Sequence, residues 1–270
     1  MLARQRQSVI LRTVRSDGSA RVSDLTQKLG VSDMTIRRDL EVLARTGLIE
    51  KVHGGAVLPG APSSHEPGFE AKSVRELPEK AVIAKAAARL VMPGAAVALS
   101  AGTTTYALAE QLFAVPGLTV VTNSMRVASL FNAARPDAPD GHGSAPASVV
   151  LTGGIRTPSE ALVGPIADLA IRSLHFDLLF LGCHGIDPAA GLTTPNLAES
   201  ETNRAFVRSA RRVIVVTDHT KWGIVGLSSF ADLDEVDTLV TDGQFPPEAR
   251  AQVADRVGQL VIAGPDATPG

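Results

Sequence analysis

The chain of 270 residues is long enough for one large or two ordinary domains, and its 44% hydrophobic content is too high for a disordered protein. Its single cysteine, Cys183, excludes an intramolecular disulfide and a cysteine-rich metal site. No apolar run is long enough to cross a bilayer, and the arginine-rich N-terminus lacks the features of a signal peptide, so a cytoplasmic location without a membrane partner is expected.

The charge is unevenly distributed, although the net charge is only −2. Residues 1–58 carry ten Lys or Arg against six Asp or Glu, a net charge of +4, and the remainder carries −6. A basic segment attached to an acidic body favours a polyanionic partner for that segment alone. Taken by itself, this excess is equally well explained by chance.

Three helices and a hairpin are predicted within residues 1–58. Apolar spacing predicts a helix over 4–15, and Gly30 ends a second helix. Ser32 is placed to cap a third helix, which Gly47 terminates. The segment 48–58 alternates weakly around a Gly-Gly pair and predicts two short strands. This order of elements is typical of a winged helix-turn-helix.

The third helix carries the residues expected to meet DNA. Ile36, Leu40 and Leu43 fall on one apolar face, which leaves short polar groups and two arginines on the others. A recognition helix meets bases and phosphates through such residues, and arginine can bind guanine through two hydrogen bonds. The expected DNA-binding residues are Ser32, Asp33, Met34, Thr35, Arg37, Arg38, Lys51 and His53. The alternative is that both arginines only pair with carboxylates one helical turn away.

A segment rich in proline and glycine, 59–68, follows the hairpin and is predicted to be a loop. We expect domains over 1–58 and 78–270, joined by a linker over 59–77. Residues 70–91 are predicted to be helical, with Pro78 in a first turn. The apolar residues expected to pack on the second domain are Val82, Ile83, Ala86 and Leu90, and the cations expected to stay solvated are Lys72, Arg75 and Lys80.

From residue 94 the pattern changes to strands that alternate with helices. Strands are predicted over 96–100, 118–122, 148–152, 177–182, 212–218 and 237–242. Continuous apolar strands separated by helices predict an α/β domain with a mostly parallel sheet covered on both faces. The polar segment 135–146 interrupts this pattern and is predicted to be a surface insertion without assigned chemistry.

Small and polar residues follow several strands, at the edge where parallel α/β sheets bind ligands. In SAGTTT (100–105), Gly102 would admit an anion to a helix N-terminus, and the threonines offer hydroxyls. A capped strand-to-helix turn explains this segment equally well, and it is not a P-loop because no lysine follows the glycine. The expected effector-binding residues are Ser100, Gly102, Thr103, Thr104, Thr105, Asn123, Gly153, Gly154, Arg156, Gly185, Asp187, Glu199 and Lys221. Together they favour a small phosphorylated ligand.

Several other residues are expected to carry no chemistry. Cys183 is predicted to be a small buried residue, and Trp222 is predicted to pack rather than cover a ligand. His53 and His184 stand without the spacing of metal ligands, so neither a metal nor a cofactor is expected.

The stretch VSDMTIRRDLEVLARTGLIEKVHGGAV (31–57) closely resembles the DNA-binding segment of the DeoR family of bacterial transcriptional regulators. The segments AGTTT, VTNS, TGG, GLTT and DHTKWG resemble that family's sensor domain, so the resemblance covers nearly the whole chain. It implies a repressor of carbohydrate metabolism genes, controlled by a sugar phosphate or related metabolite, and a sensor fold related to ribose-5-phosphate isomerase. The chain departs from the family in its insertion at 135–146, in Asn203 where many members have lysine, and in Ser100 where an acidic residue is common.

Two functions from different classes are therefore weighed. In the first, the protein binds double-stranded operator DNA as a dimer or larger homo-oligomer, because paired half-sites favour two-fold symmetry. In the second, it is a sugar-phosphate isomerase-like enzyme with Asp187, Glu199 or Lys221 as acid and base. The complete DNA-reading segment, and the lack of a carboxylate pair or nucleophile–base arrangement, favour the regulator.

Overall fold

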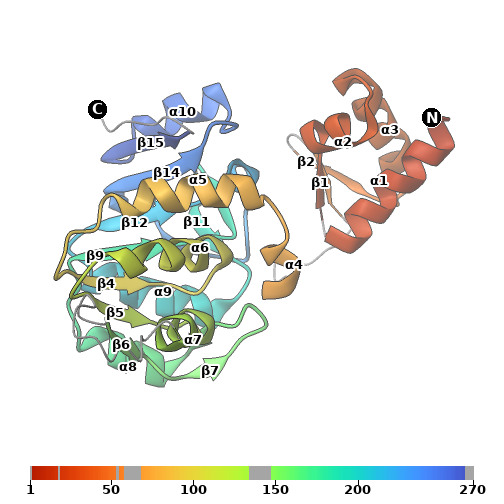
Figure 1. The fold of residues 1–270 in the computed structure, drawn as a ribbon. Helices are drawn as coiled ribbons and strands as arrows, with labels where there is room; N and C mark the ends of the chain where they lie inside the picture. The colour runs from red at the N-terminus through yellow and green to blue at the C-terminus, as the bar shows by residue number, and fades with distance from the viewer. Residues whose placement is uncertain (1, 18, 53–54, 58–67, 134–146, 265–270) are drawn as a thin grey trace. The chain divides into compact units, whose positions relative to one another are not determined.

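The computed structural model describes residues 2–17, 19–52, 55–57, 68–133 and 147–264, so His53 and the segment 135–146 lie outside the described residues. The chain forms two compact units, Met1–His65 and Glu66–Gly270 (Figure 1). Within the described ranges, none of the helices combines the length and the apolar character needed to cross a bilayer.

The N-terminal unit has the predicted three helices and hairpin. Its elements are α1 (Ala3–Asp17), β1 (Ser19–Arg21), α2 (Val22–Leu29), α3 (Asp33–Arg45), β2 (Glu50–Val52) and β3 (Gly55–Val57). β1 was not predicted, and it pairs with β3 to make a three-stranded antiparallel sheet. Apolar side chains from all three helices, including Ile10, Leu25 and Leu40, form one buried core.

The local signals that bound α3 are confirmed. The Ser32 side chain accepts a hydrogen bond from the backbone N–H of Thr35, which satisfies one of the free donors at the helix start. Gly30 and Gly47 both have left-handed backbone angles, φ +63° and +69°, a conformation that glycine adopts without steric cost. The predicted stripe of Ile36, Leu40 and Leu43 is buried.

The C-terminal unit is built on a seven-stranded sheet in the order β15-β14-β12-β9-β4-β5-β6, and all its neighbouring strands are parallel. The strands are β4 (Ala96–Leu99), β5 (Thr119–Thr122), β6 (Ser148–Leu151), β9 (Leu178–Leu181), β12 (Val213–Val216), β14 (Thr238–Asp242) and β15 (Gln259–Ala263). The six predicted strands are confirmed, and β15 was missed.

Helices cover both faces of this sheet, as predicted (Figure 1). They are α4 (Phe69–Ser73), α5 (Leu77–Ala88), α6 (Thr103–Gln111), α7 (Met125–Ala133), α8 (Pro165–Arg172), α9 (Leu197–Ser209) and α10 (Pro247–Ala254). Because strand side chains alternate between faces, Val97 and Leu99 join one apolar cluster with α5, α6 and α7. Ala98 joins a second cluster with α8, α9 and α10.

Two smaller sheets and three 3-10 turns complete this unit. β10 (Gly185–Asp187), β11 (Gly191–Thr194) and β13 (Ser228–Ala231) form an antiparallel sheet, and β7 (Ile155–Arg156) pairs with β8 (Leu162–Val163). The turns are η1 (Leu112–Ala114), η2 (His219–Lys221) and η3 (Leu233–Glu235). The segment GLTT forms strand β11, which was not predicted, and α9 begins soon after it at Leu197.

The helix predicted over 70–91 is two helices. α4 and α5 are separated by a break at Glu76, whose backbone is left-handed with φ +48°. Pro78 does lie in the first turn of α5. The expectation that Lys80 stays solvated is wrong: the residue is only 5% exposed. Lys80 Nζ donates to Lys72 O, in the last turn of α4, at 2.7 Å, and to Arg75 O, in the break between the two helices.

Candidate nucleic-acid interface and ligand site

The exposed face of α3 carries the residues expected to meet DNA. Met34 is 76% exposed, and Arg37 and Arg38 are both exposed beside it. Arg37 Nε donates to Asp33 Oδ1 one turn earlier, and this hydrogen bond raises the pKa of Arg37 further above its usual value. The pairing alternative therefore holds for Arg37. Arg38 has no ion-pair or hydrogen-bond partner in the part of the chain that the structure describes, so its guanidinium is available to a polyanion.

Lys51 lies on β2, in the hairpin that follows α3. Its Nζ is 3.2 Å from Glu41 Oε1, which belongs to α3, and both side chains are exposed. An exposed ion pair of this kind contributes little to stability and can be exchanged for a phosphate contact.

Asp39 also belongs to the TIRRDL segment, but it has a different role. Its carboxylate is buried and accepts hydrogen bonds from Arg6 Nε and, at 2.9 Å, from Gln7 Nε2, both on α1. Asp39 therefore holds α3 against α1 and fixes the angle at which the arginines are presented. Sequence reasoning missed this role, because no local pattern distinguishes Asp39 from the exposed Asp33.

The carboxyl ends of five neighbouring strands are linked by side-chain hydrogen bonds. After β4 and β5, Ala101 N donates to Asn123 Oδ1 at 2.8 Å. After β4 and β9, Gly182 N donates to Ser100 Oγ at 3.2 Å. After β9 and β12, Cys183 Sγ and Thr217 Oγ1 are 3.6 Å apart, and after β12, His219 N donates to Asp242 Oδ2 of β14 at 2.7 Å. This edge is therefore held in place before any ligand arrives.

The start of α6 is the part of this edge best suited to an anion. Gly102 is the N-cap residue, and the first N–H groups of the helix follow it. Thr104 and Thr105 are buried, and Thr105 Oγ1 donates to Gly102 O at 3.0 Å, so the Thr105 hydroxyl stabilises the turn. Thr103 is more exposed and keeps its hydroxyl available. Among the described residues, no side chain caps the first N–H groups of α6, so this helix N-terminus can receive a phosphate.

A buried charge cluster lies at the same edge, where α5 packs along α6 and β12. Burial lowers the pKa of the Lys80 ammonium to about 8, against the opposing effect of Asp218. Burial opposes ionisation of Asp218 too, but Lys221, Thr220 and Lys80 outweigh it, and its pKa is lowered. Lys80 and Lys221 both act on Asp218, and the charges of Glu76 and Arg75, which also act on Lys80, oppose each other, so the cluster has an excess of positive charge for an anionic ligand.

The neighbouring pair of His219 and Asp242 is also buried. Burial favours neutral imidazole, but the hydrogen bond and the charge of Asp242 outweigh it and raise the pKa of His219. The pKa of Asp242 is lowered even though burial opposes the charged form, because it accepts hydrogen bonds from His219 and from Gln244 N. The pair braces the end of β14 against η2 and so positions Lys221.

Several residues expected to bind effector have structural contacts instead. A Cβ on Gly154 would lie 2.6 Å from Val163 O, and one on Gly185 would lie 2.0 Å from Ile224 O, so both glycines permit close backbone packing. Both ends of the Asn123 side-chain amide are used, since its Nδ2 donates to Leu162 O at 3.1 Å. Gly153 has a left-handed backbone with φ +72°.

The charged residues that were expected to bind effector also make contacts with nearby protein groups. Asp187 Oδ1 accepts from the backbone N–H groups of Ala189 and Ala190, at 2.8 and 2.9 Å, and closes a turn. Arg156 is exposed on β7 and pairs with Glu160. Glu199, in the first turn of α9, accepts from Ser159 Oγ at 3.3 Å. These contacts hold Asp187 and Glu199 in separate turns.

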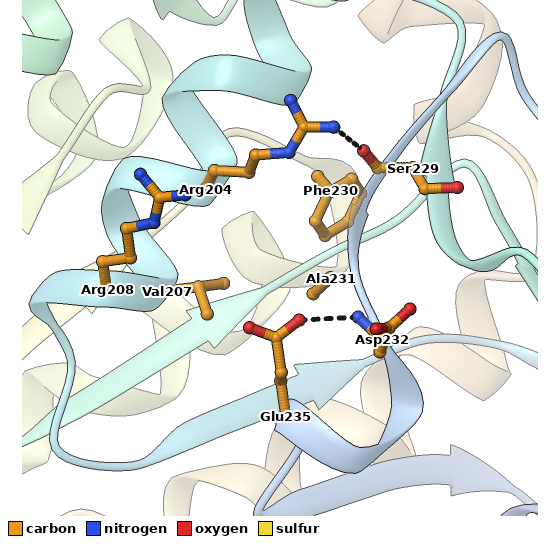
Figure 2. A pocket seen from close by; sticks show the side chains of 8 residues that line it. All are labelled: Arg204, Val207, Arg208, Ser229, Phe230, Ala231, Asp232 and Glu235. Carbon is orange, nitrogen blue, oxygen red and sulfur yellow. Dashed lines mark hydrogen bonds between the residues drawn. The ribbon is translucent and has the colours of Figure 1, made fainter.

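A hollow of about 240 Å³ lies elsewhere, between α9, β13 and η3 (Figure 2). Its lining residues are Arg204, Val207, Arg208, Ser229, Phe230, Ala231, Asp232 and Glu235. Figure 2 shows that its polar groups partly satisfy one another: Arg204 donates to Ser229 O, and Asp232 N donates to Glu235 Oε2 at 2.8 Å. Because cations and carboxylates both line the hollow, it has no clear preference for an anion.

Cys183 and Trp222, which were expected to carry no chemistry, both contact other side chains of the C-terminal unit. Cys183 is half-buried and not fully buried as expected, and burial raises the pKa of its thiol to about 12. Trp222 packs edge-on against Phe245, with ring centroids 5.5 Å apart. Among the described residues, His, Cys, Asp and Glu form no group that could hold a metal ion.

A DNA-reading winged helix joined to an α/β unit with an anion-suited edge defines the class of ligand-responsive transcriptional regulators. Residues 6–61 match the model of the DeoR-like helix-turn-helix domain, and residues 75–243 match that of the DeoR C-terminal sensor domain. The chain belongs to the DeoR family and is a DNA-binding transcriptional regulator.

Named relatives extend over nearly the whole chain. The HTH-type transcriptional regulator GlpR of Haloferax volcanii is 36% identical, covering 98% of this chain and 99% of that protein. The glycerol-3-phosphate regulon repressor of Escherichia coli is 31% identical, covering 96% and 98%. The structure of ribose 5-phosphate isomerase A from Methanocaldococcus jannaschii covers 53% of each chain at 15% identity and a TM-score of 0.37. That likeness is partial, and the parallel sheet itself defines the fold of the C-terminal unit.

Proposed function

We propose that this protein represses genes of carbohydrate metabolism, and that a phosphorylated small metabolite sets its affinity for operator DNA. The observation that carries this proposal is the pairing of a free helix N-terminus at Gly102–Thr105 with the cluster of Lys80, Asp218 and Lys221. Amide N–H groups and lysines together favour a phosphate over a neutral sugar. Operator DNA as the partner implies a cytoplasmic protein.

The set of residues that we propose to contact the ligand is smaller than the set expected from the sequence. Thr103, the backbone at Gly102 and Lys221 supply direct contacts, while Lys80 supplies charge. Asn123, Gly154, Gly185 and Asp187 act by shaping the edge. Glycerol 3-phosphate is the first compound to test, because one relative is named as the repressor of its regulon.

A thermal-shift screen of sugar and polyol phosphates, each beside its unphosphorylated counterpart, tests this function. A ligand at one hundred times its Kd stabilises the folded protein by about 2.7 kcal/mol, which raises the melting temperature measurably. Only the phosphorylated member of a pair should do so, and it should also change operator affinity. Equal shifts with the unphosphorylated compound would contradict the proposed site.

We propose binding without turnover. The separate turns that hold Asp187 and Glu199 argue against proton abstraction by the two together. Incubation with ribose 5-phosphate should therefore give no isomerised product, and a rate that depends on Glu199 would favour the enzyme instead. Because operators with paired half-sites match two-fold symmetry, we also propose that the working form is a homodimer.

A further inference from the structure

The parallel sheet ends at β6, and this edge exposes apolar side chains. β6 pairs with β5 on one side and has no strand partner on the other among the described residues. Val149, Val150 and Leu151 are 36%, 39% and 45% exposed, although neighbouring side chains of a strand point to opposite faces. An open apolar edge strand offers its free N–H and C=O groups for pairing with another chain.

The apolar surface continues onto β7 and α8, which lie beside β6 at the lower end of Figure 1. Ile155 is 69% exposed, Ile166 68% and Leu169 73%. The surface is continuous, because a Cβ on Gly153, just after β6, would lie 3.6 Å from Ile166 Cγ2. Of the β6 residues, Val150 lies on the α8 side of the sheet, because it pairs with Val121, which packs with Ile171 of α8, whereas Val149 and Leu151 lie on the α7 side. We call the apolar surface on the α8 side the β6–α8 face and define it by Val150, Ile155, Ile166 and Leu169.

Helix α8 is apolar on both of its sides. Ala167 and Ile171 are buried against the unit, while Ile166 and Leu169 point away from it. A helix in contact with water on one side normally carries polar residues there. The charged residues of α8, Asp168 and Arg172, lie beside the outward pair Ile166 and Leu169 and do not replace it. Contiguous apolar patches of this kind mark interaction surfaces.

The absence of charge on the β6–α8 face indicates what covers it. Residues 147–155 include no charged side chain. Two of the nearest charges have partners: Asp168 Oδ1 accepts from Thr202 Oγ1 at 2.6 Å, and Arg156 pairs with Glu160. The third, Arg172, is exposed at the end of α8, beyond Leu169. In a two-fold contact each surface meets its own copy, so like charges would repel, whereas a neutral apolar strand and helix are complementary to themselves.

We propose that the β6–α8 face is the self-association surface of this protein and that its occupant is a second copy of the chain. The proposed function gives such a dimer its use, but the proposal can be tested without DNA or effector. Loss of the proposed ligand response would therefore leave this interface standing, and loss of the interface would leave the ligand site standing.

Sedimentation velocity of the full chain at micromolar concentration tests the proposal. The test variant combines Ile166→Glu with Leu169→Glu, which places two carboxylates of each copy in the contact. The matched control is Met92→Glu, at a residue 69% exposed between α5 and β4. The mass obtained from sedimentation should be twice the chain mass of 28.1 kDa, or a higher multiple, for wild type and control. The test variant should give a smaller mass.

Two outcomes would overturn the proposal. One is a wild-type monomer, which would result if residues 134–146 or another protein covered this face. The other is a test variant with the wild-type mass, which would place the interface elsewhere. Trp222 fluorescence on heating checks the fold of the test variant. Should its melting differ from wild type, the single variant Leu169→Lys decides by the same criterion, since Leu169 is the most exposed residue of the face.

Discussion

The buried carboxylate of Asp39 predicts that one residue of the TIRRDL segment acts through folding and not through DNA contact. Asp39 follows the exposed Arg38 directly, yet its side chain is only 5% exposed and accepts hydrogen bonds from Arg6 and Gln7. Asp39→Ala removes both acceptors at once. We expect this variant to lose operator binding because α1 and α3 separate.

The expected loss is large relative to the stability of the unit. Removing one partner of a buried ion pair costs about 3–5 kcal/mol. A domain of this size rarely gains more than about 3–5 kcal/mol from its core, so the N-terminal unit of Asp39→Ala should be largely unfolded without denaturant. Asp39→Asn keeps an oxygen that can accept from Gln7 and should lose less. Asp33→Ala, at a side chain 55% exposed, is the matched control and should remain folded.

The composition of the chain makes the two units separately observable. Residues 1–65 contain no aromatic side chain, and the single tryptophan, Trp222, lies in the C-terminal unit. Amide hydrogen exchange in α1 and α3 therefore reports on one unit, and tryptophan fluorescence reports on the other. Asp39→Ala should lose exchange protection in both helices while the Trp222 melting curve stays unchanged. Wild-type protection together with wild-type operator affinity would refute the reasoning.

Four further predictions follow from the described contacts. If Arg38 contacts a base, Arg38→Ala should weaken operator binding by about 1–3 kcal/mol. If Arg38 contacts a phosphate, the variant should lower the slope of log binding constant against log salt concentration by about 1. Arg37→Ala should weaken operator binding as well. Gly102→Val should abolish the effector response and keep operator affinity, because a Cβ there already lies 3.1 Å from Thr105 Oγ1 and a valine would block the anion. In the wild type, the free energy of unfolding of the C-terminal unit should rise between pH 8 and about 10.4, because in this range Lys80 is protonated only in the unfolded state. Lys80→Met should remove this rise. Phe69→Ala should uncouple effector binding from operator binding.

The first three of these predictions would be contradicted by the following results. Operator binding by the arginine variants that matches wild type across a salt series would exclude contact with DNA. A folded Gly102→Val protein that responds to the same metabolite at the same concentration would move the site away from α6. Denaturant unfolding of Lys80→Met that keeps the wild-type pH dependence would assign the rise to another group. Melting curves accompany all three measurements.

The sequence predicted those features that depend on neighbouring residues. The continuous apolar runs gave six of the parallel strands, and Ser32 and Gly47 bounded α3 because caps act within one helical turn. β15 was not predicted, although its run QLVIA carries the same apolar signal as the other strands. The DeoR resemblance identified the family, which the match of both domain models confirms.

Features that depend on distant residues could not be predicted. Gly102, Gly154 and Gly185 look alike in the sequence. The structure shows that Gly154 and Gly185 allow close packing, because the backbone of Val163 lies against the first and that of Ile224 against the second. Lys80 is buried where it donates to carbonyls at the end of α4 and in the break that follows it. Periodicity shows which face of an element is apolar, but it does not show which charged group another element will cover.

The contacts of α4 explain why Phe69 is expected to couple the two sites. Phe69 packs edge-on against Tyr106, in the first turns of α6, with ring centroids 6.0 Å apart. Arg126, at the start of α7, stacks on Phe69 with 4.2 Å from its Cζ to the ring centroid and also pairs with Glu70. Lys80 caps the other end of α4. The helix that follows residues 58–67 in the chain is thus docked on the elements that make up the proposed ligand site.

A ligand changes DNA affinity only through unequal affinity for two conformations, and the coupling is reciprocal. If docked and released α4 are those conformations, Phe69→Ala shifts the balance toward release whatever the ligand. Effector and operator should then each bind, but neither should alter the affinity of the other, whereas wild type should show coupling of about 1–3 kcal/mol. Phe69→Leu keeps an apolar side chain in the same place and should retain part of the coupling. Calorimetric titration of effector with and without operator measures both variants, and full reciprocal coupling in a folded Phe69→Ala protein would show that the signal does not pass through α4.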